Sequence, residues 1–382
     1  MGTVTNDFLT LFDTLLQLPS VSSANPALDM SNRPVIEHLA TVFTPLGFAC
    51  EILDVPEHPG KANLIATRGS GPGGLILSGH TDTVPFDEAL WQCDPLRLTQ
   101  RDNRLYGLGS TDMKGFFAVV HAALQTFIDT PFKQPLIVVA TADEESSMDG
   151  ARALVRQGRP QGRYAVIGEP TGLRPINRHK GVMMERLHVQ GQSGHSSNPA
   201  LGRNALEAMV EMIGALQALR QELQQRYRNP HFALDLPTLN LGVIQGGDNP
   251  NRICGHCQLE FDVRLLPGMA SDPLRQAIRE RLTPIADKHQ VTFTFTPLFP
   301  GVEAFTNDSS ELLRVCEQLT GHSGASVSYG TEAPFFQQLG MDTLVLGPGS
   351  IDVAHQPNEY MALDQVQPCI TLLQGLVRHY CL

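Results

Sequence analysis

Short apolar runs without polar interruption alternate with helical patterns through the first 180 residues of the chain. Four such runs are 74-GLILSGH-80, 136-LIVVA-140, 164-YAVIG-168 and, much later, 343-TLVLG-347. Continuous runs are typical of strands buried on both faces of a parallel sheet that helices cover. A helix is expected to begin near Asp112 and to continue through 116-FFAVVHAALQTF-127. The pattern predicts an α/β domain with a mostly parallel mixed sheet flanked by helices.

The middle of the chain has a different pattern. Polar and apolar residues alternate in 183-MMERLHVQG-191, 238-TLNLGVIQGG-247 and 257-CQLEFDVRLL-266. Such alternation indicates antiparallel strands with one face in water. Helical patterns lie near residues 203–225 and 272–288. We therefore expect an inserted α+β unit at residues 181–292, between segments 1–180 and 293–382 of the larger domain.

Composition limits the possible partners and the compartment. The 382 residues include 39 acidic and 28 basic side chains, and the net charge of −11 disfavours nucleic acid or an anionic membrane as a partner. Seven scattered cysteines fit a reducing compartment better than a disulfide framework. The early acids Asp7 and Asp13 argue against a signal peptide, and no apolar run approaches the roughly 20 residues of a membrane span. A cytoplasmic protein is expected.

Acids or histidines follow each of the four apolar runs. They are His80 and Asp82 after the first, Asp143, Glu144 and Glu145 after the second, Glu169 after the third and His355 after the fourth, with Asp112 closing 107-GLGSTD-112. Taken singly, each is an ordinary loop residue or an acid at a helix N-terminus. Because sites in open parallel sheets form outside the carboxyl ends of the strands, their repetition predicts one shared site.

Several carboxylates beside two imidazoles repel one another unless a divalent cation lies among them. Imidazole and carboxylate without thiolate suit Zn²⁺, Co²⁺ or Mn²⁺. His80 and Asp82 are two residues apart and point the same way if the strand continues, so the Asp82 carboxylate is expected to accept the second ring N–H of His80. Glu144 and Glu145 point apart in extended backbone, which would leave one as a ligand and the other as a base.

Five motifs together resemble the M20 family of metallopeptidases and deacylases, in order from about residue 60 to residue 360. They are 78-SGHTDTVP-85, 105-LYGLGSTDMKG-115, 143-DEE-145, 168-GEPT-171 and 193-SGHSS-197. Longer blocks are most similar to the subfamily that deacetylates N²-acetyl-L-ornithine: 189-VQGQSGHSS-197, 238-TLNLGVIQGGDNPNRIC-254, 329-YGTEAPFF-336 and 345-VLGPGSIDVAHQPNEY-360. Succinyl-diaminopimelate desuccinylases usually carry Gly-Thr-Ser-Asp where this chain has 330-GTEA-333.

The resemblance implies a zinc-exopeptidase-like domain, a ferredoxin-like lid and dimerisation domain, a homodimer, and two Zn²⁺ per subunit with Co²⁺ or Mn²⁺ as possible substitutes. The implied metal ligands are His80, Asp112 as the bridge, Glu145, Glu169 and His355. The implied catalytic residues are Asp82, which orients His80, Glu144 as general base, and His195, which reaches the partner subunit's active site and polarises the scissile carbonyl. The implied substrate contacts are Asn251, Arg264, Gly330 and Thr331.

The implied reaction is hydrolysis of N²-acetyl-L-ornithine to L-ornithine and acetate, a step of arginine biosynthesis. For the substrate's α-carboxylate the first candidate is Arg264, with Arg252 and Lys180 behind it, and Glu332 is a candidate for the side-chain ammonium. The alternatives are another M20 deacylase, such as a desuccinylase or aminoacylase, a peptidase of the family, or a non-catalytic metal-binding scaffold. The scaffold is the least favoured, because Glu144 and Asp112 are both present.

Overall fold

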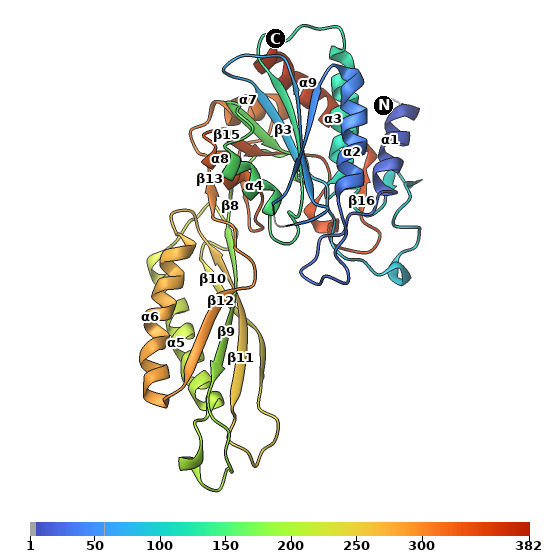
Figure 1. The fold of residues 1–382 in the computed structure, drawn as a ribbon. Coiled ribbons are helices and arrows are strands. Elements are labelled where there is room, and N and C mark those ends of the chain that lie inside the picture. The colour runs from blue at the N-terminus through green and yellow to red at the C-terminus, as the bar shows by residue number, and fades with distance from the viewer. Residues whose placement is uncertain (1–4, 57) are drawn as a thin grey trace. The chain divides into compact units, whose positions relative to one another are not determined.

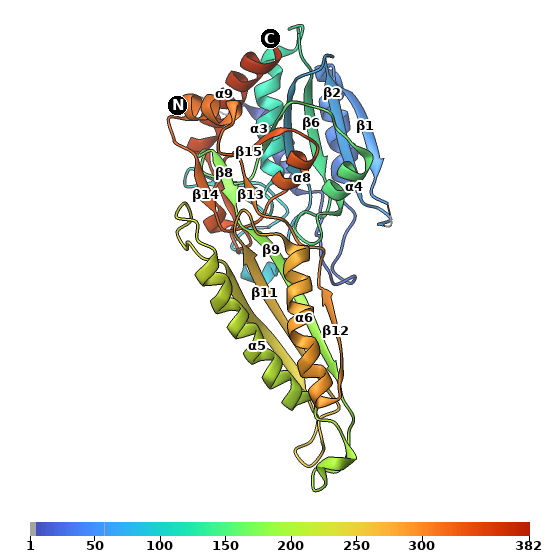
Figure 2. The ribbon, with the colours of Figure 1, turned by 90° about the vertical axis from the view of Figure 1, so that its left-hand side faces the viewer.

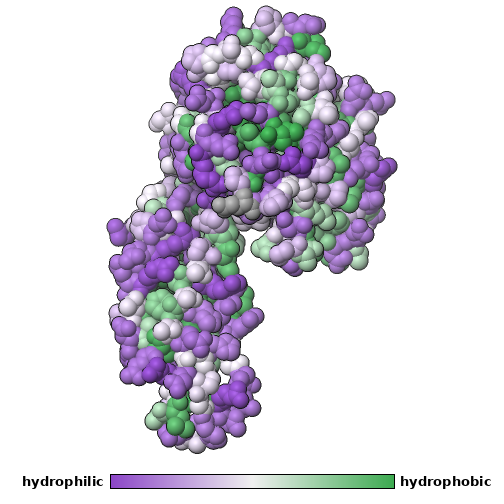
Figure 3. All heavy atoms as spheres, in the orientation of Figure 1, coloured by the Kyte–Doolittle hydropathy of each residue, from purple (hydrophilic) through white to green (hydrophobic). Residues whose placement is uncertain are grey.

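The computed structural model describes residues 5–56 and 58–382, and the chain divides into two compact units. Unit 1 contains the residues up to Asn177, Asn307–Ala325 and Thr331–Leu382. Unit 2 contains Arg178–Thr306 and Ser326–Gly330. Unit 2 thus extends beyond the boundary at residue 292 expected from the sequence, because a further strand, β12, pairs with β9 in its sheet. On the face drawn in Figure 3, polar residues predominate, with small apolar patches between them.

Unit 1 is built on a mixed sheet with the order β1-β2-β6-β3-β7-β15-β8 (Figure 1). Its strands are β1 (Ala49–Asp54), β2 (Ala62–Arg68), β3 (Leu75–His80), β6 (Leu136–Thr141), β7 (Tyr164–Ile167), β8 (Ile176–His179) and β15 (Asp342–Val345). The four central strands, β6, β3, β7 and β15, are parallel, and the outer pairings are antiparallel. The predicted sheet class is confirmed, and the four parallel strands are the four continuous apolar runs.

Helices cover both faces of this sheet (Figures 1 and 2). One face carries α1 (Asn6–Leu16), α2 (Arg33–Phe43), α3 (Lys114–Leu124), α7 (Glu311–Thr320) and α9 (Leu363–Cys381), and the other carries α4 (Asp149–Gln157) and α8 (Ala333–Gln338). Alternate strand residues such as Leu75 and Leu77 point into the larger core, where they join Phe12, Phe43 and Phe117. This apolar packing on both sides fixes the carboxyl ends of the strands.

Smaller elements complete the chain. A three-stranded sheet contains β4 (Thr99–Arg101), β5 (Arg104–Tyr106) and β16 (Tyr360–Ala362), and β13 (Phe305–Thr306) and β14 (Ala325–Val327) pair with β8. Single 3-10 turns are η1 (Thr44–Leu46), η2 (Glu88–Leu90), η3 (Gln125–Phe127), η4 (Pro199–Leu201) and η5 (Ile351–Val353). Within the described residues, no helix combines the length and apolar character needed to cross a membrane.

Unit 2 has the order β-α-β-β-α-β (Figure 2). Its elements are β9 (Gly181–Gln190), α5 (Ala205–Arg226), β10 (Thr238–Gly246), β11 (His256–Leu265), α6 (Ser271–His289) and β12 (Thr292–Pro297). The strands form an antiparallel sheet in the order β10-β11-β9-β12, which is the ferredoxin-like arrangement. The two helices share a buried core with the sheet, in which Met209, Ile278 and Phe261 take part.

Candidate active site

Unit 1 brings the predicted acids and histidines together at the carboxyl ends of its central strands. His80 is the last residue of β3 and pairs with Thr141, the last residue of β6. The loops after β6 and β7 carry Glu144 and Glu169, and both side chains lie close to the His80 ring. The parallel register therefore aligns the strand ends, and the loops that follow supply the donors.

The His80 ring is completely buried and makes contacts on both of its nitrogens. Its Nε2 lies 3.1 Å from Asp112 Oδ1 and 4.0 Å from Glu169 Oε1. Its Nδ1 lies 3.0 Å from the backbone carbonyl of Asp82, whereas the Asp82 carboxylate is 3.6 Å away. Burial lowers the pKa of His80, but the surrounding carboxylates of Asp112, Asp82 and Glu169 together outweigh burial and raise it well above its ordinary value.

The expected contact of the Asp82 carboxylate with the His80 ring is therefore wrong in detail. The strand ends at His80, so the two-residue alternation does not continue to Asp82. The backbone carbonyl of Asp82 meets the ring, and its carboxylate accepts the backbone N–H groups of Glu144 and Glu145 at 3.2 and 3.0 Å. Asp82 thus supports the loop after β6 as well as His80.

A second imidazole meets the same acids from the loop before β16. His355 Nε2 lies 2.9 Å from Glu145 Oε1 and 3.3 Å from Asp112 Oδ2. Hydrogen bonds to these two carboxylates raise the pKa of His355 to about 10. The two oxygens of Asp112 thus face two different imidazoles, His80 and His355, as a bridging carboxylate would.

Two groups of side chains place their donor atoms within 4.8 Å of one another: His80 with Glu144 and Glu169, and His80 with Asp112 and Glu145. The expectation that adjacent Glu144 and Glu145 point apart assumed extended backbone. Both residues instead lie in a turn, so both carboxylates face the site. Glu144 is therefore placed close enough to be a ligand as well as a base.

The electrostatics of the cluster favour a divalent cation. Burial and then repulsion from Glu169 raise the pKa of Glu144 well above its ordinary value, and burial and then repulsion from Asp112 do the same for Glu169. Glu169 Oε1 is buried and has no hydrogen-bond partner among the described residues. A dipositive ion offsets the repulsion and satisfies such an oxygen, so the donor set fits a metal of the zinc, cobalt or manganese type.

Sequence patterns missed a buried support behind the loop after β6. Lys61 Nζ donates to Asp143 Oδ1 at 2.6 Å and to Asp29 Oδ1 at 2.8 Å, and Ser22 Oγ donates to Asp143 Oδ1 at 2.9 Å. The backbone of Asp143 is left-handed, with φ of 58°. Its carbonyl accepts the N–H of Ser147 at 3.0 Å. These contacts fix the turn that carries Glu144 and Glu145.

Unit 2 holds three of the predicted substrate contacts together with His195. The Ser196 N–H donates to the carbonyl of Asn251 at 3.0 Å, so the loops of His195 and Asn251 lie side by side. Arg264 lies near the other end of β11, where its Nε donates to Asp262 at 3.1 Å. Gly330 lies beside Val182, which pairs with Arg264.

The two ends of β11 are far apart. The strand spacing places Arg264 about 26 Å from His256, the end nearest His195. Within unit 2 the structure therefore does not bring Arg264 and Gly330 together with His195 and Asn251. Thr331 belongs to unit 1, where its buried Oγ1 accepts the N–H of Ala333 at 3.1 Å.

The other proposed substrate contacts are engaged elsewhere. Lys180 Nζ is nearly buried and donates to the carbonyls of Leu234 and Leu236. Arg252 pairs with Asp248 at 2.6 Å. Glu332 is completely buried, its Oε2 accepts from Thr141, and burial raises its pKa to about 7. The Arg264 side chain is partly exposed and bonds to Asp262 on its own strand, and the Arg252 side chain is the more exposed of the two.

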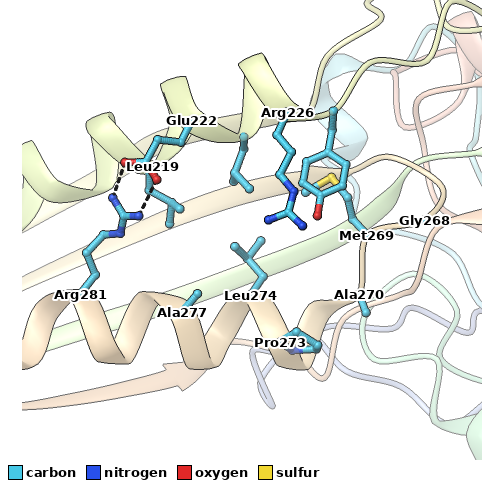
Figure 4. A pocket seen from close by; sticks show the side chains of 12 residues that line it. Leu219, Glu222, Arg226, Gly268, Met269, Ala270, Pro273, Leu274, Ala277 and Arg281 are labelled. Atoms are coloured by element: carbon cyan, nitrogen blue, oxygen red, sulfur yellow. Dashed lines mark hydrogen bonds and ion pairs between the residues drawn. The ribbon is translucent and has the colours of Figure 1, made fainter.

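A separate hollow of about 430 Å³ lies in unit 2 between α5 and α6 (Figure 4). Apolar side chains such as Leu223 and Leu274 line it, and the ion pair of Arg281 with Glu222 closes one side. None of the predicted metal donors lies there. The metal-donor cluster of unit 1 therefore remains the candidate active site.

The sequence of the chain decides its family. The model of peptidase family M20/M25/M40 matches residues 76–379. The chain belongs to this family. The acetylornithine deacetylases of Photorhabdus laumondii and Klebsiella pneumoniae are each 46% identical to it, over 98% of the chain and 97% and 98% of their own lengths. The acetylornithine deacetylase of Edwardsiella ictaluri is 46% identical over the whole of both chains. The family resemblance read from the motifs is confirmed.

Solved structures share the fold at low identity. A metallo-carboxypeptidase of the family from Sulfolobus solfataricus superposes with a TM-score of 0.75 at 17% identity, covering 98% of this chain and 99% of that one. An aminopeptidase from Bacillus cereus gives 0.74 at 19% identity, with the same coverage. These similarities confirm the α/β architecture of the M20 chain and do not specify its substrate.

Proposed function

We propose that this M20 enzyme is a metal-dependent amidohydrolase that converts N²-acetyl-L-ornithine to L-ornithine and acetate. The observation that carries the proposal is the convergence of seven predicted residues at one end of the unit 1 sheet, in a chain 46% identical to curated acetylornithine deacetylases over nearly its whole length. A scaffold without catalysis would not need Glu144, a partly buried acid outside the five proposed ligands, beside the donors.

Two Zn²⁺ ions per subunit are proposed to occupy the cluster, with Co²⁺ or Mn²⁺ as substitutes. The ligands would be His80, Asp112, Glu145, Glu169 and His355, with Asp112 between the two ions. When bound, such ions polarise a carbonyl oxygen and lower the pKa of a coordinated water to about 7. The carboxylate and imidazole donors, and the unpartnered Glu169 oxygen, support this choice.

The chain's own residues would transfer the proton from the attacking water to the leaving amine. Glu144 accepts a proton from the attacking water and delivers it to the leaving amine, because its carboxylate lies among the donors and its backbone is held by Asp82. The carbonyl of Asp82 keeps Nδ1 of His80 engaged, so that Nε2 faces the donors. His195 would stabilise the oxyanion of the substrate.

We further propose that unit 2 is a lid and dimerisation domain and that the enzyme is a homodimer. β10 is an edge strand with exposed Val243 and Ile244, and the helix that packs on it, α5, exposes Leu206 and Val210. An apolar edge of this kind favours association with another chain. Arg264 lies near one end of β11, and the loop that carries His195 lies beyond the other end. We therefore propose that His195 and Asn251 serve the active site of the partner subunit.

The test is ornithine release from N²-acetyl-L-ornithine by zinc-reconstituted protein, with metal-free protein as the control. Release that requires the metal supports the proposal. N-succinyl-L,L-diaminopimelate, other N-acetylated amino acids and dipeptides form the comparison panel. Intact, metal-loaded protein that hydrolyses one of these faster than N²-acetyl-L-ornithine would overturn the substrate assignment.

A further inference from the structure

Glu359 is a buried acid, 2% exposed, that contacts the loop of Asp112 but is not one of the metal donors. Its Oε2 accepts the N–H of Gly109 at 2.9 Å. Its Oε1 accepts the N–H groups of Thr111 at 2.7 Å and Asp112 at 3.0 Å. Its backbone carbonyl accepts the N–H of Gly107 at 3.1 Å. A single residue thus binds four backbone donors of one loop.

That loop has little conformational preference of its own. Gly107 and Gly109 have φ of 156° and 77°, and flexible glycines make many other backbone conformations accessible. Helix α3 follows directly, and its N-cap residue, Met113, makes no side-chain capping bond. The two side-chain oxygens of Glu359 therefore supply the contacts that select one conformation of the loop.

The same acid joins the two loops that deliver metal donors. His355 lies four residues before Glu359, and Tyr360, directly after it, pairs with Tyr106 just before the Asp112 loop. At the site, His355 Nε2 lies 3.3 Å from Asp112 Oδ2. A change at Glu359 would therefore shift donors on both loops relative to each other.

We propose that Glu359 is a positioning residue for the metal centre: it holds the backbone of Asp112 and ties this loop to the loop of His355. The inference rests on the proposed metal-dependent function, but it concerns metal affinity, which is measured without substrate. Removing the bonds of Glu359 to the loop keeps every metal-donor residue in the chain but loosens the positions of the donors relative to one another.

The test is E359Q in the full-length protein. Glutamine keeps the shape, but it has one acceptor oxygen, and its NH₂ group would face a backbone N–H, so at least one of the three bonds is lost. Zinc affinity of the metal-free protein, measured by chelator competition, is expected to fall 10- to 100-fold. The absorption spectrum of the cobalt-loaded variant is expected to change, and its circular dichroism to match the parent. E359D keeps both oxygens on a side chain one methylene shorter, so it is expected to bind zinc more tightly than E359Q but less tightly than the parent.

A matched control removes a comparable bond away from the site. Glu317 Oε1 on α7 accepts the N–H of Gly324 at 2.7 Å, and E317Q is expected to leave zinc affinity unchanged. Zinc affinity of E359Q within twofold of the parent, with the same cobalt spectrum, would overturn the proposal, as would an equal loss in E317Q. If E359Q does not fold, parental zinc affinity and an unchanged cobalt spectrum in E359D would overturn it instead. A parent that binds zinc but releases no ornithine would reject the proposed substrate and not this role.

Discussion

E144Q separates two roles that the geometry allows for Glu144, proton carrier and metal ligand. The substitution keeps the size of the side chain, and the hydrogen bond to Asp82 is retained because the backbone N–H makes it, at 3.2 Å. The loop is therefore expected to keep its position. What is lost is the carboxylate charge and its ability to take up a proton, at a point where its oxygen lies within 4.8 Å of donor atoms of His80 and Glu169.

The size of the effect follows from the role. General base catalysis contributes about 10²- to 10⁴-fold to the rate, equivalent to about 3–5 kcal/mol of barrier. If Glu144 acts as the base, the E144Q protein is expected to keep two zinc ions per subunit while kcat falls by that factor. As a ligand, its loss lowers zinc content together with kcat. Ornithine release and zinc analysis of the same gel-filtered sample measure both, with E145A as the comparison that is expected to lose metal.

The charge argument adds an independent check. E144Q removes one of four carboxylates from a buried cluster whose members repel one another, so metal-free E144Q is expected to have a higher Tm than the metal-free parent. A fully metal-loaded E144Q enzyme with kcat within tenfold of the parent would refute the assignment of Glu144 as the base. An unchanged or lower Tm of the metal-free variant would refute the repulsion argument.

Three further predictions concern other residues. H195A is expected to keep its metal and lose about 10²- to 10³-fold in kcat, the usual effect of removing an oxyanion donor, and parental kcat would exclude that role. R275A removes the cationic partner, 2.8 Å away, of the completely buried Glu185. The variant is expected to lose about 3–5 kcal/mol of unfolding free energy in urea titrations. A loss below about 1 kcal/mol would contradict this. Burial lowers the pKa of His179 to about 4. Between about pH 6.5 and pH 4, this histidine is therefore protonated in the unfolded chain but not in the folded chain. This group therefore removes about 3 kcal/mol of stability as pH falls through that window, and H179Q should flatten the measured pH profile.

The parallel strands were predictable because they are buried on both faces and so are continuously apolar. β2 (Ala62–Arg68) is also mostly buried in this sheet but was not predicted from the sequence, because polar Asn63 and Thr67 interrupt its apolar run. Asn63 is tolerated in the interior because its side chain bonds to the carbonyl of Gly150 and the N–H of Ala142. Those partners lie far from Asn63 in the sequence, so the local pattern of residues does not predict them.

The candidate metal donors His80, Glu144, Glu145, Glu169 and His355 were predictable for a related reason, since each follows a strand that is itself predictable, whereas Asp112 was found at the end of a glycine-rich segment. Their supports were not predictable. Lys61 reaches Asp143 across 82 residues, and Glu359 reaches Asp112 across 247. The contact predicted for Asp82 was wrong because two-residue alternation holds only while a strand continues, and β3 stops at His80. The apolar pattern of a strand can be read from neighbouring residues, whereas the contacts that hold these loops in place join residues far apart in the sequence.

The residues that support the site hold carboxylates that repel one another close together. Its carboxylates repel one another, so flexible loops would separate them whenever the metal is absent. Asp82 holds the backbone of Glu144 and Glu145, Lys61 fixes Asp143 beneath them, and Glu359 holds the loop of Asp112. Two of these three supports are themselves acids that bind backbone N–H groups. They fix the loops before the cation binds, so that little conformational entropy is lost when it does.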